Sequence, residues 1–217
     1  MLNTVTQTFL FSYLVLFGLT IITFIEALKT SQPRLRHMLN LETSVSLIAG
    51  FVYSIFYDML KKGNIELEQI TVYRYMDWCI TTPMLLLVLL TFLNFDNKRD
   101  IHMTVYIYIV ILNYTMLISG YLGETGRMEK RRAGIVGFIA FAIMLAIIYF
   151  VFLHEAPFFL NNYILFCVFS IVWSMYGVAY YLDTVSKNIM YNFLDVIAKA
   201  IFGVFIWLYY GNVVVFP

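Results

Sequence analysis

Seven long apolar runs dominate this sequence and restrict what the chain can fold into. A helix needs about 20 mostly apolar residues to cross a bilayer. Seven segments meet that requirement, at about 8–30, 40–61, 71–94, 101–122, 132–153, 161–182 and 188–213. Short polar connections join them and, with the runs, use up the 217 residues. We therefore predict an all-α membrane protein, a seven-transmembrane-helix bundle that forms a single domain over residues 1–217.

The composition supports the same class. The chain is 62% hydrophobic and 12% charged, whereas a soluble domain is about half apolar and a quarter charged. The formal net charge of +1 offers no basic surface for a nucleic acid. The expected partner is the lipid bilayer, with no nucleic acid, and no soluble signalling module is expected.

Four charged residues lie deep inside the predicted spans: Arg74, Asp77, Asp195 and Lys199. A charge at the bilayer centre costs about 2.5–3.5 kcal/mol even on lenient scales, so such charges normally pair and mark a functional site. Asp195 and Lys199 are four residues apart and Arg74 and Asp77 three apart, so each pair shares a helix face. We predict a buried quadrupole between the third and seventh helices. Two ion pairs that only hold helices together are the less favoured alternative.

Aromatic residues surround these charges in the sequence. Trp173, Tyr176 and Tyr180 follow one face of the sixth predicted helix, and Tyr75 and Trp78 flank Asp77. Such a stripe is usually only core packing. Around a buried primary amine, however, an aromatic box suits a long, flat, apolar carbonyl ligand bound as a Schiff base.

The motifs that carry these residues resemble one family. "RYMDWCITTPMLLL" and "FLDVIAKAIFG" look like helices C and G of the microbial (type 1) rhodopsins, and "WSMYGVAYYL" resembles helix F. With its short loops and a carboxylate in helix B, the chain is most similar to the viral rhodopsins of giant algal viruses (group 2). The resemblance implies that Lys199 carries all-trans retinal as a protonated Schiff base. It also implies that Asp77 is the primary counterion and proton acceptor, Asp195 the second counterion, and Arg74 the gate on the extracellular side.

The resemblance implies a retinal pocket as well, with no enzymatic activity and no metal. Its residues are Trp78, Thr82, Leu85, Met116, Gly120, Trp173, Tyr176, Tyr180 and Ala198. Thr81 is expected to bond the Asp77 carboxylate, and Asn113 stands where a polar residue of helix D often bonds the residue at Thr82. The family's polarity places the N-terminus outside and the C-terminus in the cytoplasm. The basic residues of the loops do not by themselves favour that orientation.

One departure from the family's proton pumps concerns the proton donor. Val88 occupies the position of their carboxylic donor, eleven residues or about 16 Å past Asp77, and valine has no proton to give. Glu42 is the best candidate in its place. The alternative is that Asn40 caps the second helix and Glu42 only stabilises its first turn. Glu26 is expected to pair with Lys29 or to reach the membrane interface.

The leading interpretation is a light-driven proton transporter, in which the Schiff base loses its proton to Asp77 and regains one from the helix-B carboxylate. A light-gated ion channel is the first alternative, and a sensory rhodopsin with a separate transducer is the second. The transported species would be protons or small cations. The chain is expected to form a homo-oligomer, a trimer or a pentamer, in which Arg34 and Arg36 of the first loop line a central cavity.

Overall fold

The computed structural model describes residues 2–95 and 100–210 and is built of helices throughout that range. The helices are α1 (Leu2–Lys29), α2 (Pro33–Lys61), α3 (Leu67–Leu93), α4 (Met103–Glu124), α5 (Lys130–Ile148), the π-helical η1 (Tyr149–His154), α6 (Leu160–Tyr180) and α7 (Thr184–Tyr210). With η1 counted as the end of α5, seven of them are long and apolar enough to cross a membrane. The seven predicted spans are therefore confirmed, and the chain is an integral, multi-pass membrane protein. The predicted end of the last span, at 211–213, lies outside the described residues.

The start of α2 differs most from the prediction. The helix begins at Pro33, seven residues earlier than expected, and Gln32 has the extended backbone of an N-cap. Proline is favoured at the first helical position because its missing N–H would have no helical partner there. Arg34 and Arg36, predicted in the loop, thus lie in the first turn of α2. The cap hypothesis is wrong, since Glu42 lies more than two turns inside the helix.

The start of α7 also differs from the prediction. Asp183 caps this helix, because its Oδ1 accepts hydrogen bonds from the backbone N–H groups of Val185 and Ser186, both at 3.1 Å. The hydroxyl and the backbone N–H of Ser186 hold the pKa of Asp183 below its usual value. Lys187, predicted to lie in a loop, is instead part of α7 and is buried.

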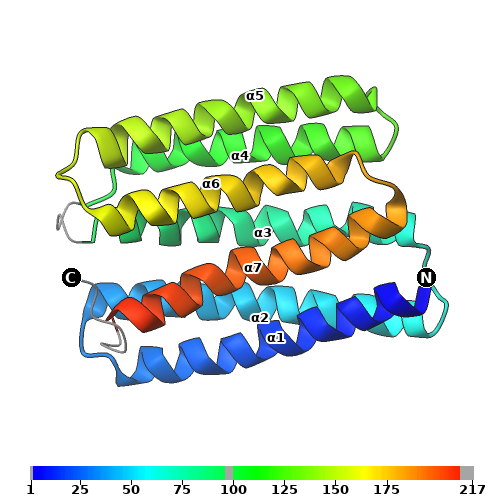
Figure 1. The fold of residues 1–217 in the computed structure, drawn as a ribbon, viewed down its shortest axis with the longest axis horizontal. Coiled ribbons are helices and arrows are strands. Elements are labelled where there is room, and N and C mark those ends of the chain that lie inside the picture. The colour runs from blue at the N-terminus through cyan, green and yellow to red at the C-terminus, as the bar shows by residue number, and fades with distance from the viewer. Residues whose placement is uncertain (1, 96–99, 211–217) are drawn as a thin grey trace. The chain divides into compact units, whose positions relative to one another are not determined.

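The described residues form two compact units, one of residues 2–70 and 183–210 and the other of residues 71–95 and 100–182. In the first unit, α1, α2 and α7 run side by side (Figure 1). Val5, Phe9 and Leu16 of α1 pack against Ala49 and Tyr53 of α2 in a buried core. Partly buried polar bonds cross this unit too, between the hydroxyls of Thr43 and Thr23 at 2.8 Å and from Asn192 to Thr8 at 2.8 Å.

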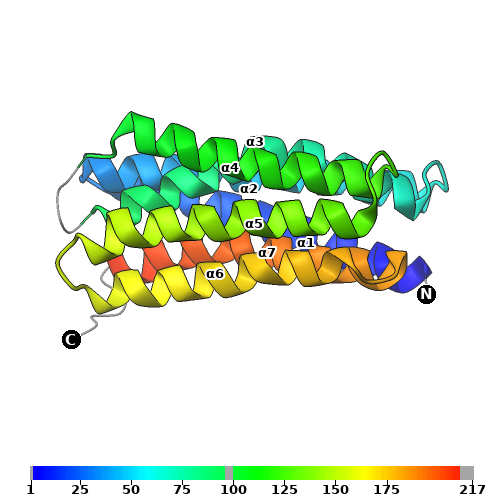
Figure 2. The ribbon, with the colours of Figure 1, turned by 90° about the horizontal axis from the view of Figure 1, so that it is seen from above.

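In the second unit, α4 lies beside α5, and α5 beside α6 (Figure 2). Tyrosines of α4 connect it to α3 at Pro83, which interrupts the helical hydrogen bonds because proline has no N–H. Tyr114 donates to the backbone C=O of Cys79, the carbonyl that Pro83 would otherwise have bonded, at 3.1 Å. Tyr106 donates to the C=O of Pro83 itself, also at 3.1 Å. The carbonyl that Pro83 leaves without its helical partner is thus bonded by a side chain, as a bilayer requires.

Candidate functional site

Lys199 and Asp195 form a buried ion pair on α7. The Lys199 Nζ lies 3.7 Å from Asp195 Oδ2, and each side chain is only 2% exposed. The predicted pairing at i and i+4 is confirmed, and it explains how a lysine is tolerated at this depth.

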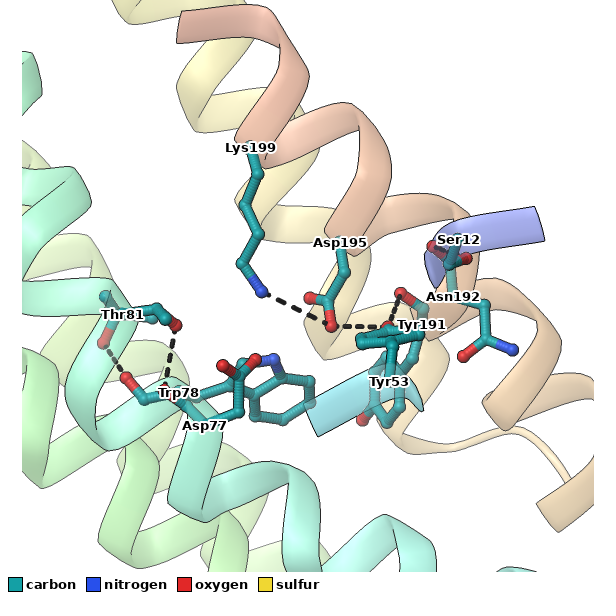
Figure 3. A network of polar contacts seen from close by, with 10 residues as sticks. Ser12, Tyr53, Asp77, Trp78, Thr81, Tyr191, Asn192, Asp195 and Lys199 are labelled. Carbon is teal, nitrogen blue, oxygen red and sulfur yellow. Dashed lines mark hydrogen bonds and ion pairs between the residues drawn. The ribbon is translucent and has the colours of Figure 1, made fainter. Parts of the chain in front are cut away.

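Tyr53 of α2 completes this pair, as Figure 3 shows. Its hydroxyl donates to Asp195 Oδ2 at 2.6 Å, a short bond of the charge-assisted kind. The hydroxyl also lies 3.5 Å from the backbone C=O of Tyr191. The Asp195 carboxylate is therefore held from two sides, by an ammonium on its own helix and by a phenol on the neighbouring one. Sequence reasoning missed Tyr53, although its place three helical turns from Glu42 on one face of α2 was a usable signal.

Ser12 and Asn192 extend this polar region toward α1. The Ser12 hydroxyl donates to the backbone C=O of Asn192 at 3.1 Å, and Asn192 Nδ2 donates to Thr8 at 2.8 Å. Both residues are buried. Near Asp195, α1 and α7 are thus joined by hydrogen bonds from polar side chains, as is common between helices within a membrane.

Glu42 lies in the interior of the first unit and is fully buried. Its Cγ would lie 3.3 Å from a Cβ at Gly203 of α7, so the two helices meet closely at this level. Neither carboxylate oxygen has a hydrogen-bond partner among the described residues. The charge of Lys199 and the backbone N–H of Gly203 both act on the Glu42 carboxylate.

Glu26 differs from Glu42. Its Oε1 lies 3.0 Å from Lys29 Nζ, in a pair whose lysine is largely exposed. The predicted Glu26–Lys29 pair is confirmed.

Arg74 and Asp77 are buried on α3, at 1% and 3% exposure, while Tyr73 and Met76 between and beside them are exposed. One face of α3 thus carries both charges inward. Thr81 lies one turn further on, but its hydroxyl donates to the backbone C=O of Asp77 at 2.9 Å. The predicted bond from Thr81 to the Asp77 carboxylate is wrong, because the single hydroxyl proton is used on the main chain, as is usual for threonine in a helix.

Aromatic residues gather within the second unit. Trp78 contacts Tyr75 and Tyr176 edge to face, with ring centroids 5.1 and 5.5 Å apart. Trp173 packs against Phe169 at 4.5 Å. Trp78, Tyr75 and Tyr176 thus form an edge-to-face cluster of the kind that aromatic side chains favour.

The remaining predicted pocket residues are placed as follows. Thr82, Leu85, Trp173 and Ala198 are buried, and Met116 and Tyr176 are half-buried. Asn113 Nδ2 donates to Thr82 Oγ1 at 2.8 Å, which confirms the predicted bond.

Two predicted pocket residues have definite contacts of their own. Gly120 abuts Tyr75, whose hydroxyl would lie 2.7 Å from any Cβ added there, so a larger side chain has no room. Tyr180 is buried, but its hydroxyl lies 3.4 Å from the backbone C=O of Lys130, and the Lys130 ammonium lies 5.1 Å from its ring centroid. The polar end of Tyr180 is therefore occupied by the start of α5.

Comparisons with known proteins agree with these features. The family described as bacteriorhodopsin-like protein matches residues 3–213. The green-light absorbing proteorhodopsin of Gamma-proteobacterium EBAC31A08 is 27% identical over 158 residues, 63% of this chain and 60% of that protein. The match therefore spans less than two thirds of the proteorhodopsin's length.

Solved structures extend the similarity over nearly the whole chain. The crystal structure of viral rhodopsin OLPVRII has a TM-score of 0.90 and 34% identity, covering 98% of this chain and 100% of that one. The proton pumping rhodopsin AR2 from the marine alga Acetabularia acetabulum shares the fold, with a TM-score of 0.80 at 19% identity, over 97% of this chain and 96% of its own. The predicted likeness to the microbial rhodopsins, and to viral ones in particular, is confirmed, and with it the predicted fold class.

Proposed function

This chain belongs to the bacteriorhodopsin-like family, and from that premise we propose that it is a light-driven proton transporter with all-trans retinal carried on Lys199. Proteins of this family are photoreceptors and transporters that bind retinal. The observation that carries the proposal is the buried Lys199–Asp195 pair, with a primary amine 2% exposed inside a membrane span. A free amine at this depth is costly, and a covalent carbonyl ligand gives it a use. The bound retinal supplies a light-driven change of geometry next to the Lys199 nitrogen.

The carboxylates take different parts in this proposal. Asp195 is held by Tyr53 and by the Lys199 nitrogen, so it stabilises a positive charge at that nitrogen without needing to take its proton. Asp77, buried on α3, is the proposed proton acceptor. A buried acceptor favours proton transfer within a dry site. Arg74, one turn before Asp77 on the same face, would then separate Asp77 from the extracellular side when the N-terminus is outside.

Glu42 is the proposed proton donor. Its contact with Gly203 supports this role, because Gly203 lies one helical turn beyond Lys199 on α7. Full burial and the lack of a hydrogen-bond partner among the described residues leave its carboxyl group available. To donate, Glu42 must hold a proton before illumination. Val88 cannot serve, and Glu26 is engaged by Lys29.

A light-gated channel remains the second candidate function. Polar bonds between α1, α2 and α7, among them Ser12–Asn192 and Thr43–Thr23, favour it. Polar side chains between helices can line a path for water and ions. Such a path would conduct in either direction, whereas a proton donor and a proton acceptor that act in sequence give transport one direction. The shared fold with a proton pumping rhodopsin supports the pump at the level of the fold only.

Light-induced pH change in vesicles tests the proposal. Vesicles with equal pH and no potential across the membrane should develop a pH difference on illumination, and a protonophore should abolish it. Asp77→Asn should lose this signal while keeping visible absorption. A vesicle population that shows no pH change, although the protein is coloured and uniformly oriented, would overturn the transport proposal.

A further inference from the structure

One face of α2 lies against α7 over three helical turns. It carries Glu42, Ser46, Ala49 and Tyr53, spaced as residues on one side of a helix, and all four are at most 1% exposed. Two contacts fix the register of this face on α7. Tyr53 bonds Asp195 at 2.6 Å, and the Glu42 side chain abuts Gly203.

The register places Ser46 at the level of Lys199. Lys199 lies four residues from both Asp195 and Gly203, which is about 6 Å along α7 in each direction. Ser46 lies four residues from Glu42, about 6 Å along α2, on the side toward Tyr53. Because the two helices are antiparallel, the step from Glu42 to Ser46 on α2 matches the step from Gly203 to Lys199 on α7. Ser46 is thus level with the Lys199 backbone. Because the Lys199 side chain extends toward Asp195, Ser46 lies between Glu42 and the amine along the helix axes.

The Ser46 hydroxyl differs from those of its neighbours. Thr20 and Ser44 each donate to the backbone C=O four residues earlier, both at 2.9 Å. That bond is the ordinary choice of a hydroxyl inside a helix. Ser46 does not make it, and its Oγ has no hydrogen-bond partner among the described residues although it is fully buried.

Three buried polar atoms on one turn of α2 thus lack partners: both carboxyl oxygens of Glu42 and the hydroxyl oxygen of Ser46. Buried polar groups are almost always bonded, to the protein or to an ordered water. A buried water typically makes about three hydrogen bonds to groups that the protein leaves unsatisfied. The Glu42 carboxyl group and the Ser46 hydroxyl, one turn apart, offer both hydrogen-bond donors and acceptors to a single water molecule between them.

We propose that Glu42 and Ser46 hold an ordered water between them, and that this water carries the proton from Glu42 toward the Lys199 nitrogen. In this step the carboxyl O–H of Glu42 gives its proton to the water, which passes one of its own protons onward. Ser46 acts as a positioning residue, since it orients the water. The relay rests on the proposed donor role of Glu42, but the water site itself does not.

Infrared spectroscopy of the unilluminated protein tests the water site. The C=O stretch of protonated Glu42 is identified by its loss in Glu42→Gln, and the bound water by the shift of its O–H stretch in H₂¹⁸O. Ser46→Ala should move the Glu42 band to higher frequency, because its carboxyl loses a hydrogen bond, and should remove the water band. Ser44→Ala is the matched control, since Ser44 lies on the same helix but is only half-buried and donates to the backbone C=O of Asn40. It should change neither band.

Flash spectroscopy then tests the relay. Ser46→Ala should slow the return of the proton to the Lys199 nitrogen about tenfold, which corresponds to about 1.4 kcal/mol, while Ser44→Ala leaves the rate unchanged. Ser46→Cys replaces the hydroxyl by a thiol, which is a weaker donor. If Ser46→Ala is poorly folded, Ser46→Cys should still slow proton return, by a factor below ten.

The outcomes separate the two proposals. Glu42 and water bands that do not change in Ser46→Ala would overturn the water site. Bands that change without any slowing would overturn the relay and leave the water as a structural one. If Glu42→Gln leaves proton return at its normal rate, the donor role fails, and the bands of the unilluminated protein still decide whether the site exists.

Discussion

The bond between Tyr53 and Asp195 is the polar contact of the site whose energy the structure defines best. At 2.6 Å to a carboxylate that also pairs with Lys199, it belongs to the class of hydrogen bonds to charged groups, worth about 1.5–3 kcal/mol. Tyr53→Phe keeps the ring, which packs in the core of the first unit, and removes only the hydroxyl. We expect it to lower the free energy of unfolding by about 2 kcal/mol.

In the retinal-free protein, Asp195→Asn should cost more, about 3–5 kcal/mol, because it leaves the Lys199 ammonium buried without its carboxylate. In that background the Tyr53 hydroxyl faces a neutral amide, and such bonds are worth only about 0.5–1.5 kcal/mol. Tyr53→Phe should therefore cost about 1 kcal/mol less there than in the natural protein.

A double-mutant cycle measures this coupling. The free energy of unfolding is determined by reversible unfolding in mixed micelles as the fraction of denaturing detergent is increased. Tyr57→Phe is the matched control on the same helix, since it keeps the ring near the Lys61 ammonium, and should change stability by less than about 0.5 kcal/mol. If the effects of the Tyr53 and Asp195 substitutions simply add, to within about 0.3 kcal/mol, the hydroxyl does not act on the carboxylate charge. Tyr53 would then have no part in stabilising the charged site.

Three further predictions concern Lys199, Glu42 and Asp183. Lys199→Ala should abolish visible absorption after retinal is added. A variant that still absorbs visible light would refute Lys199 as the attachment site. Glu42→Gln should slow proton return to the Lys199 nitrogen at least tenfold in flash spectroscopy. An unchanged photocycle would refute the proposed donor role of Glu42. Asp183→Ala should lower stability near pH 7 in unfolding measurements. Because the folded-state pKa of Asp183 is lowered, its contribution is present above the unfolded pKa of about 3.9 and is lost as pH falls below it. The variant and the natural protein should therefore converge in acid, and a difference independent of pH would contradict the capping role.

The number and order of the helices could be predicted from the sequence because the length of an apolar run decides whether a helix spans a bilayer. The helix ends were less predictable. Arg34 and Arg36 were assigned to a loop because they are charged, yet long basic side chains can extend from a helix end to water. Pro33 was the better signal, since it favours the first helical turn. The π-helical end of α5 at Tyr149–His154 had no marker in the sequence.

The charged residues of the site were predictable from their residue types and depth alone. The contacts of Tyr53 and Ser46 were not, because they depend on the register of α2 against α7, which the periodicity of a single helix does not reveal. Thr81 illustrates the same limit in reverse. Its spacing from Asp77 was read correctly, but the choice between a side-chain and a main-chain acceptor is made by local geometry.

The central claim, that light drives protons one way through this chain, is tested most directly by photocurrent against voltage in a planar bilayer of defined composition. With identical solutions on both sides, we predict a stationary current at zero voltage that keeps its direction over a wide voltage range and disappears in Asp77→Asn. A current that vanishes at zero voltage and reverses with the applied field would contradict the account and identify the protein as a light-gated channel.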